Sequence, residues 1–118
     1  MSEPRSHLTV TSRDGVNVVE FADRKILDEL CIAEIREELT ALVRSGGSKT
    51  TLLSFRNVDY LSSAALSVLI TLKNQVGAQA GRLMLSDISP QIFEVFKITK
   101  LNKLFEIHDT AEEALEHV

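Results

Sequence analysis

Two serines stand where an apolar strand pattern changes into a helical one. Residues 51–55 form a short apolar run typical of a buried strand, and behind Ser63 the apolar residues recur every three or four positions, as on one face of a helix. Ser62 and Ser63 therefore lie at a strand-to-helix junction. The first N–H groups of a helix are unpaired and its dipole is positive there, so this position suits a phosphate group. The junction favours a protein-binding switch controlled by phosphorylation.

Strand and helix patterns alternate along the chain after an opening hairpin. In the first half, the patterns predict a strand over 7–11, a turn at Asp14 and Gly15, a strand over 16–21, a polar break over 23–25, and a helix over about 32–43 that stops at Gly46 and Gly47. A strand over 50–55, a helix over 63–79 and a strand over 82–86 follow. The last predicted elements are a helix that opens at Ser89 and Pro90, a strand over 105–108, and a helix that opens with a capping box at 110–113. We expect an α/β fold: a small mixed sheet of four to five strands with an antiparallel opening hairpin, and about four helices.

Length and composition bound the class of protein. With 118 residues, of which 44% are hydrophobic and 25% charged, the sequence is typical of one globular domain over residues 1–118. An aromatic content of 5% and a net charge of −4 argue against a nucleic-acid partner. No apolar run has the roughly 20 residues that span a bilayer, and no signal segment opens the chain, so we expect a cytoplasmic protein without membrane contact.

Some apolar residues exceed what a single helical stripe requires. Some of Phe93, Ile98 and Leu101 are candidates for partial exposure and for a contact surface, although packing against the neighbouring sheet is the better explanation. Cys31 is the only cysteine, which excludes an internal disulfide and a thiolate metal cluster. Its place beside the apolar stripe of the first helix predicts a core residue.

The sequence offers no catalytic machinery. Residues 61–65 lack both glycines of a nucleophile elbow, so a serine hydrolase is not indicated. The sequence gives no acidic partner to His7, His108 or His117, and ordinary surface histidines are the simpler interpretation. Metal-ligand spacings, phosphate-binding loops and dinucleotide fingerprints are not found. We therefore expect no enzyme activity, no metal and no cofactor.

The serine pair also has a purely structural interpretation. Serine is a preferred helix cap, because its oxygen accepts a hydrogen bond from a backbone N–H two or three residues on, which contributes about 1 kcal/mol. On pattern alone, capping is the better explanation. The same geometry leaves a hydroxyl accessible at a helix start, where a phosphate would be stabilised by the dipole.

The segment from Asn57 to Leu69, NVDYLSSAALSVL, resembles the signature of the STAS domain family of bacterial anti-sigma factor antagonists, in which a strand runs into Asp-Ser-Ser/Thr-Gly-Leu-Gly at a helix start. The similarity extends along nearly the whole chain. It implies that Ser63 is phosphorylated by an ATP-dependent serine kinase, usually the anti-sigma factor itself. The unphosphorylated antagonist would bind the anti-sigma factor and free the sigma factor, and phosphorylation would break the complex. Asp28 would then lie near the phosphoserine, although an acid at a helix start is an equally good explanation.

Three positions depart from the family pattern. Ser62 replaces the aspartate, Ala65 replaces the glycine after the Ser/Thr pair, and Ser67 replaces the second glycine. These changes remove a charge beside Ser63 and add bulk where a partner approaches, so they bear on recognition by a kinase. Ser62 is an alternative acceptor of the phosphate. Asp59 can supply the missing charge, although a strand-end or turn role is simpler.

We expect a partner-binding surface with the members Asp28, Asp59, Ser62, Ser63 and Ala65. Two functions remain open. The first is a regulator of transcription that binds an anti-sigma factor or serine kinase in a signal-transduction pathway. The second is a STAS-like binding subunit of a transport ATPase or of a stress-signalling complex, which needs the same surface and no phosphorylation. The protein is expected to be a monomer or a weak dimer.

Overall fold

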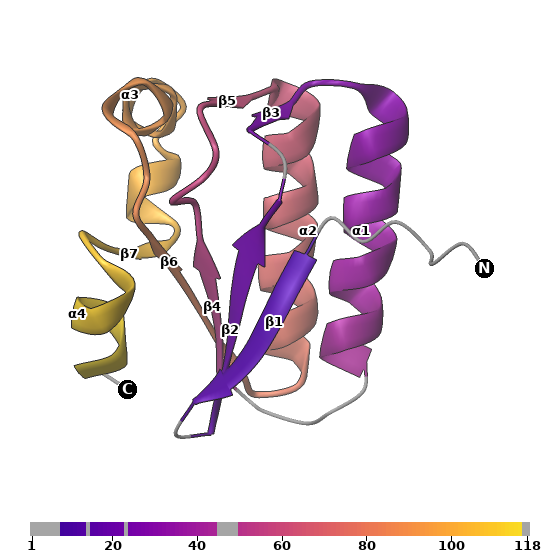
Figure 1. Cartoon of the computed structure of the whole chain (residues 1–118), viewed down its shortest axis with the longest axis vertical. Helices are drawn as coiled ribbons and strands as arrows, with labels where there is room; N and C mark the ends of the chain where they lie inside the picture. Colours follow the sequence, from indigo (N-terminus) through magenta and orange to yellow (C-terminus); the bar gives the residue numbers. More distant parts are fainter. Residues whose placement is uncertain (1–7, 14, 23, 45–49, 117–118) are drawn as a thin grey trace.

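A mixed sheet with helices on both faces forms the molecule, as the computed structural model in Figure 1 shows. The structure describes residues 8–13, 15–22, 24–44 and 50–116. In chain order the elements are β1 (Leu8–Arg13), β2 (Val16–Phe21), β3 (Lys25–Ile26), α1 (Glu29–Arg44), β4 (Thr50–Ser54), β5 (Tyr60–Leu61), α2 (Ser63–Ala78), β6 (Arg82–Ser86), α3 (Pro90–Ile98), the 3₁₀-helix η1 (Leu101–Lys103), β7 (Glu106–His108) and α4 (Ala111–Glu116).

The main sheet has five strands in the order β1-β2-β4-β6-β7. The hairpin strands β1 and β2 pair antiparallel, whereas β2 with β4, β4 with β6 and β6 with β7 pair in parallel. The predicted mixed sheet with an antiparallel opening hairpin is therefore confirmed. Gly15 has a φ of 80°, the left-handed conformation that suits glycine in a tight turn. The other predicted turn residue, Asp14, and the predicted helix stop at Gly46 and Gly47 lie outside the described residues.

The predicted helices all form, with small differences at their ends. The first begins at Glu29, three residues earlier than the apolar stripe predicts, because Asp28 caps it. Ser89 caps α3 through the N–H of Ile92, and Pro90 occupies the first turn, as predicted. Thr110 accepts a hydrogen bond from the N–H of Glu113 at the start of α4, which matches half of the predicted capping box.

The polar break predicted over 23–25 contains part of a strand. Lys25 and Ile26 form β3, which pairs in parallel with β5 in a separate two-stranded sheet. This pairing is called the β3–β5 ribbon below. Each of its strands has two residues, too few to show the alternation by which strands are found in a sequence.

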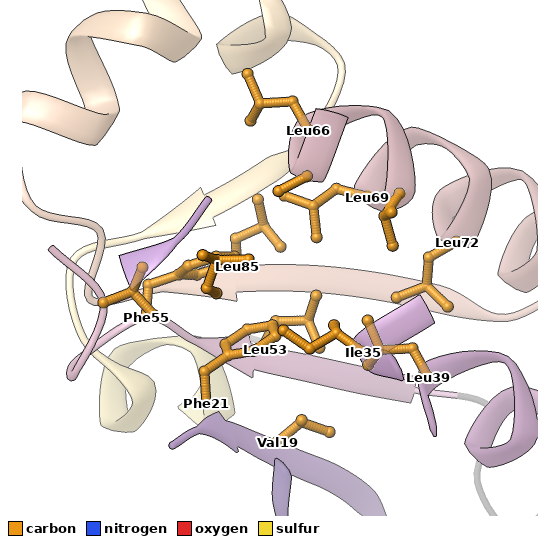
Figure 2. Close-up of a cluster of buried hydrophobic side chains, with 14 of the residues drawn as sticks. Val19, Phe21, Ile35, Leu39, Leu53, Phe55, Leu66, Leu69, Leu72 and Leu85 are labelled. Carbon is orange, nitrogen blue, oxygen red and sulfur yellow. The ribbon is translucent and has the colours of Figure 1, made fainter. Parts of the chain in front are cut away.

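The main core lies between the sheet and the helices α1 and α2. Figure 2 shows side chains from three strands meeting side chains from both helices; the labelled ones are Val19, Phe21, Leu53, Phe55, Leu85, Ile35, Leu39, Leu66, Leu69 and Leu72. Cys31 is buried in the same cluster, so its predicted place in the core is confirmed. A smaller cluster lies on the opposite face of the sheet, where Ala111 and Ala114 of α4 pack on residues of β2, β4 and β6.

Several apolar side chains of α3 and η1 are not buried. Ile98 is 79% exposed, while Phe93 and Leu101 are half-buried. Partial exposure of some of these residues is therefore confirmed, while Leu101 also packs against the main core, and a contact surface here stays a prediction. Within the described ranges, no helix is both long and apolar enough to cross a membrane.

Candidate functional site

The start of α2 is capped by Ser62. Its backbone is extended, with φ −81° and ψ 165°, and its Oγ accepts a hydrogen bond from the N–H of Ala65 at 3.2 Å. The carbonyl oxygen of Ser62 accepts from the N–H of Leu66 at 3.1 Å. The capping interpretation of the serine pair therefore applies to Ser62, whose hydroxyl is used to pair the first turn of the helix.

Ser63 is the first residue of α2 and is exposed. Its carbonyl oxygen accepts a hydrogen bond from Ser67 Oγ at 3.4 Å, but its own hydroxyl bonds to no other group in the part of the chain that the structure describes. The first turn of α2 holds no acidic side chain. A negative group on Ser63 would therefore meet the positive end of a helix of 16 residues whose dipole no acid within that turn offsets.

The β3–β5 ribbon brings the starts of α1 and α2 together. Lys25 pairs with Tyr60 and Ile26 with Leu61, and the N–H of Ser62 donates to the carbonyl oxygen of Ile26 at 3.0 Å. Each strand of the ribbon runs within three residues into its helix, so the two helices begin side by side at the same end of the molecule (Figure 1). Asp28 and Ser63 each stand two residues beyond the last pair of this register, Ile26 and Leu61.

Asp28 is the cap of α1. Its Oδ2 accepts a hydrogen bond from the N–H of Cys31 at 3.0 Å, and its carbonyl oxygen accepts from the N–H of Ile32 at 3.0 Å. The geometry thus supports the structural explanation for Asp28, an acidic residue at a helix start. Asp28 is also exposed to solvent.

Asp59 forms an ion pair with Arg24 just ahead of the ribbon. Two nitrogens of Arg24, Nε and Nη2, donate to the same carboxylate oxygen of Asp59 at 2.9 and 2.7 Å. The carbonyl oxygen of Arg24 accepts from the N–H groups of Asp59 and Tyr60 at 2.7 and 3.1 Å. Asp59 therefore has the strand-end role considered for it. Nothing in the sequence of the polar break marks Arg24 as the partner of a carboxylate 35 residues away.

Three large apolar side chains are exposed around the same helix starts. Leu27 is 51% exposed, Leu30 66% and Tyr60 50%. The ammonium group of Lys25 lies 5.6 Å from the centre of the Tyr60 ring, which orients that ring. No sequence pattern marks Leu27 or Tyr60 as exposed, whereas Leu30 stands outside the buried stripe of α1 and is predictable on that ground.

Ala65 does not reach this surface. Its side chain is 4% exposed and belongs to the main core. The helical repeat explains why, because Ala65 stands on the same side of α2 as the buried Leu69 and Leu72. Ser67, by contrast, is exposed. Of the five residues predicted for the partner surface, Ala65 is thus buried, Ser62 is used as a cap, and Ser63 is an exposed residue with a free hydroxyl among the described groups.

A separate charged cluster joins β6, β7 and α4. Arg82 donates to both carboxylate oxygens of Glu106, through Nε to Oε1 at 2.8 Å and through Nη2 to Oε2. These bonds lower the pKa of Glu106 below its ordinary value, and His108, whose Nε2 lies 2.9 Å from Glu106, adds to the shift. The side chain of His108 is 13% exposed, so its interpretation as a surface histidine is wrong. His7 and His117 lie outside the described residues.

A family model and a similar protein indicate the same family for this chain. The family model of the STAS domain matches residues 7–114. BtrV of Bordetella bronchiseptica, which is named as an anti-sigma factor antagonist, is 31% identical over 107 residues that cover 91% of this chain and 90% of BtrV.

Two solved structures have a similar fold. An anti-sigma-factor antagonist (STAS) domain protein of Planctomyces limnophilus has a TM-score of 0.84 at 22% identity, covering 97% of this chain and 98% of its own. The Bacillus protein SpoIIAA in its phosphorylated form has a TM-score of 0.71 at 20% identity, covering 93% of this chain and 97% of its own. Because the family model matches residues 7–114 of this chain, the chain belongs to the STAS domain family.

Proposed function

We propose that this protein is an anti-sigma factor antagonist whose binding to an anti-sigma factor is controlled by phosphorylation of Ser63. The observation that carries the proposal is the different use of two adjacent serines. Ser62 Oγ is occupied as the cap of α2, whereas the hydroxyl of Ser63 is exposed and makes no hydrogen bond within the described chain. A kinase can therefore modify Ser63 without removing the cap.

The surroundings of Ser63 support a protein partner. Leu27, Leu30 and Tyr60 are each at least half exposed near the starts of the two helices. Tyrosine is enriched at protein interfaces, and the two exposed leucines add apolar area that a partner can remove from water. The proposed partner surface consists of Leu27, Asp28, Leu30, Tyr60 and Ser63, and it does not include the buried Ala65.

Phosphorylation would change this surface more than it changes the fold. The phosphate adds close to two negative charges, which the start of α2 tolerates because its dipole is positive there. An apolar partner that docks over Ser63 would have to remove water from those charges, at a large cost in free energy. The carboxylate of Asp28, at the neighbouring helix start, would also repel the phosphate on Ser63. The unphosphorylated form is therefore the one that binds.

In this scheme the protein is the substrate of a reaction and not its catalyst. The kinase transfers the γ-phosphoryl group of ATP to Ser63 Oγ, the hydroxyl proton leaves to a base of the kinase, and ADP is the other product. BtrV is named as an anti-sigma factor antagonist, which supports an anti-sigma factor as the partner. Sigma factors act on transcription, so the proposed function belongs in the cytoplasm.

The test is mass spectrometry of the intact protein and its peptides after incubation with ATP and an extract of the source cells. We expect one phosphate, mapped to Ser63, which is absent in Ser63→Ala and retained in Ser62→Ala. Modification of Ser62 instead would contradict the assignment of the site. An extract that phosphorylates another antagonist but leaves this protein unmodified would contradict the switch.

A second candidate is a binding subunit of a transport ATPase or of a stress-signalling complex that is never phosphorylated. The motif positions that differ from the family pattern, Ser62, Ala65 and Ser67, favour it, because they alter the segment that a kinase would read. It predicts the same partner surface and equal binding by Ser63→Ala and Ser63→Asp.

A further inference from the structure

We infer that the ion pair between Arg24 and Asp59 positions Ser63. By holding β3 against β5, it keeps Ser63 in a folded helix start, so a partner meets this serine as part of a rigid surface and not as an extended segment. The structural part of the inference stands by itself, and its consequence for a kinase rests on the proposed function.

The β3–β5 ribbon needs support from outside its own strands. Each strand has two residues, and a pair of strands this short has little stability of its own. Arg24 supplies the support at the open end of the ribbon. Its carbonyl oxygen accepts from the N–H groups of Asp59 and Tyr60, and its guanidinium donates twice to the Asp59 carboxylate. Arg24 thus holds the segment of Asp59 and Tyr60 through both its backbone and its side chain.

The ribbon is connected directly to the start of α2. At its other end, the N–H of Ser62 donates to the carbonyl oxygen of Ile26 at 3.0 Å, and Ser62 Oγ caps the N–H of Ala65. If β3 separates from β5, Ser62 loses the partner of its N–H, and the residue before Ser63 is no longer fixed. The same separation would move Leu27 and Asp28, which directly follow β3, away from Ser63.

The ion pair affects local order rather than the stability of the whole domain. The side chain of Arg24 is 76% exposed and that of Asp59 36%, and exposed ion pairs contribute little to global stability. Neither side chain belongs to the main core, which holds the buried Phe21, Ile26 and Phe55. Removing the pair should therefore raise the frequency of local opening and leave global unfolding nearly unchanged.

Hydrogen exchange of single amides, measured by NMR, tests the structural part. In Arg24→Gln we expect the N–H of Ser62 to exchange about fivefold faster, while the N–H of Leu53 in β4 keeps its rate. Arg24→Lys keeps one positive charge and should show a smaller increase. The double variant Arg24→Asp, Asp59→Arg should restore much of the protection of the Ser62 N–H, because it rebuilds the ion pair with the two charges swapped.

Arg82→Gln is the matched control. It breaks a second arginine–carboxylate pair, Arg82 with Glu106, at the amino ends of β6 and β7 and away from the start of α2. We expect it to leave the exchange of the Ser62 N–H unchanged. If Arg24→Gln also leaves that rate unchanged, or if both variants raise it equally, the inference is overturned.

Phosphorylation tests the consequence. With ATP and the same cell extract, Arg24→Gln should gain phosphate on Ser63 several-fold more slowly than the natural protein, at equal global stability, and the reversed pair should recover. A faster reaction in Arg24→Gln would overturn the inference, because it would mean that the kinase uses the opened segment. If the natural protein takes no phosphate, the proposed function fails, and the exchange rates still decide whether the ion pair positions Ser63.

Discussion

Ser62 Oγ accepts the N–H of Ala65 at 3.2 Å, while the hydroxyl of the next residue, Ser63, has no such bond among the described residues. One serine is therefore required by the helix, and its neighbour is available for modification. This division explains how a helix start can carry a regulatory group without losing its cap. It also makes the two residues separable by experiment.

Replacement of each serine by alanine should affect stability differently. Ser62→Ala removes the cap of α2 and should lower the free energy of unfolding by about 1 kcal/mol. Ser63→Ala removes an exposed hydroxyl that has no partner among the described residues. It should change the free energy of unfolding by less than about 0.5 kcal/mol. Urea unfolding followed by circular dichroism measures both values. Equal losses would contradict the different roles assigned to the two hydroxyls.

A charge at position 63 should weaken the complex with the anti-sigma factor. We expect Ser63→Asp to reduce affinity at least about tenfold, or about 1.4 kcal/mol, because a carboxylate must be desolvated in the interface. Ser63→Ala should bind as the natural protein does. Calorimetric titration of the purified partner gives the affinities, and urea unfolding confirms that both variants are folded. Equal affinities at equal stability would exclude a charge switch at this residue.

Asp28 can be tested for its two possible roles with two variants. Asp28→Asn keeps an oxygen that can cap the N–H of Cys31, so it should retain stability and lose only the negative charge. Asp28→Ala loses the cap as well and should cost about 1 kcal/mol. If Asp28 repels a phosphate on Ser63, the phosphorylated Asn variant should regain part of its affinity for the partner. No gain would restrict Asp28 to capping.

The local parts of this structure could be predicted, and the pairings between distant segments could not. The caps Ser62 and Ser89 and the strand and helix patterns depend on neighbouring residues, which the sequence displays directly. The contact of Arg24 with Asp59 joins positions 35 residues apart and leaves no periodic signal. The burial of His108 likewise depends on packing between β7 and its neighbours.

Ala65 is a different case, because the sequence did contain the information. Its spacing from Leu69, Leu72 and Val76 follows the helical repeat and places it on the core side of α2. The family motif drew attention to its position in the signature, and the period of the helix determines the side on which it lies. Inside a helical motif, the phase of the helix thus decides which residues can face a partner.

Two exposed apolar residues allow a matched test of the partner surface. Leu30, 66% exposed, stands in the first turn of α1, at the end of the molecule where α2 also begins, whereas Ile98, 79% exposed, lies at the end of α3. Leu30→Asp should weaken binding of the anti-sigma factor at least about tenfold, because the new carboxylate would have to lose its water in the interface. Ile98→Asp should leave affinity unchanged. Neither variant should lose much stability, since neither side chain is in the core. A greater effect at Ile98 would move the partner surface to α3.

The pair of Arg82 and Glu106 should make folding stability depend on pH in the acid range. Hydrogen bonds from Arg82 lower the pKa of Glu106 in the folded protein below its ordinary value of 4.5. The folded state therefore favours the carboxylate, and this contribution is fully present above the ordinary pKa and is lost as the pH falls through the lowered one. Both side chains are more than one third exposed, so solvent screens the pair and the contribution is modest.

The variant Glu106→Gln isolates that contribution. The natural protein should be the more stable of the two at pH 7, and the difference in the free energy of unfolding should shrink as the pH is lowered from about 6 to about 3. Urea unfolding at each pH measures it. Arg82→Gln should reduce the acid sensitivity of the natural protein in the same range, because Arg82 is the main cause of the pKa shift. A difference that stays constant across this range would mean that Glu106 titrates alike in the folded and unfolded chain, and that the ion pair has no part in acid stability.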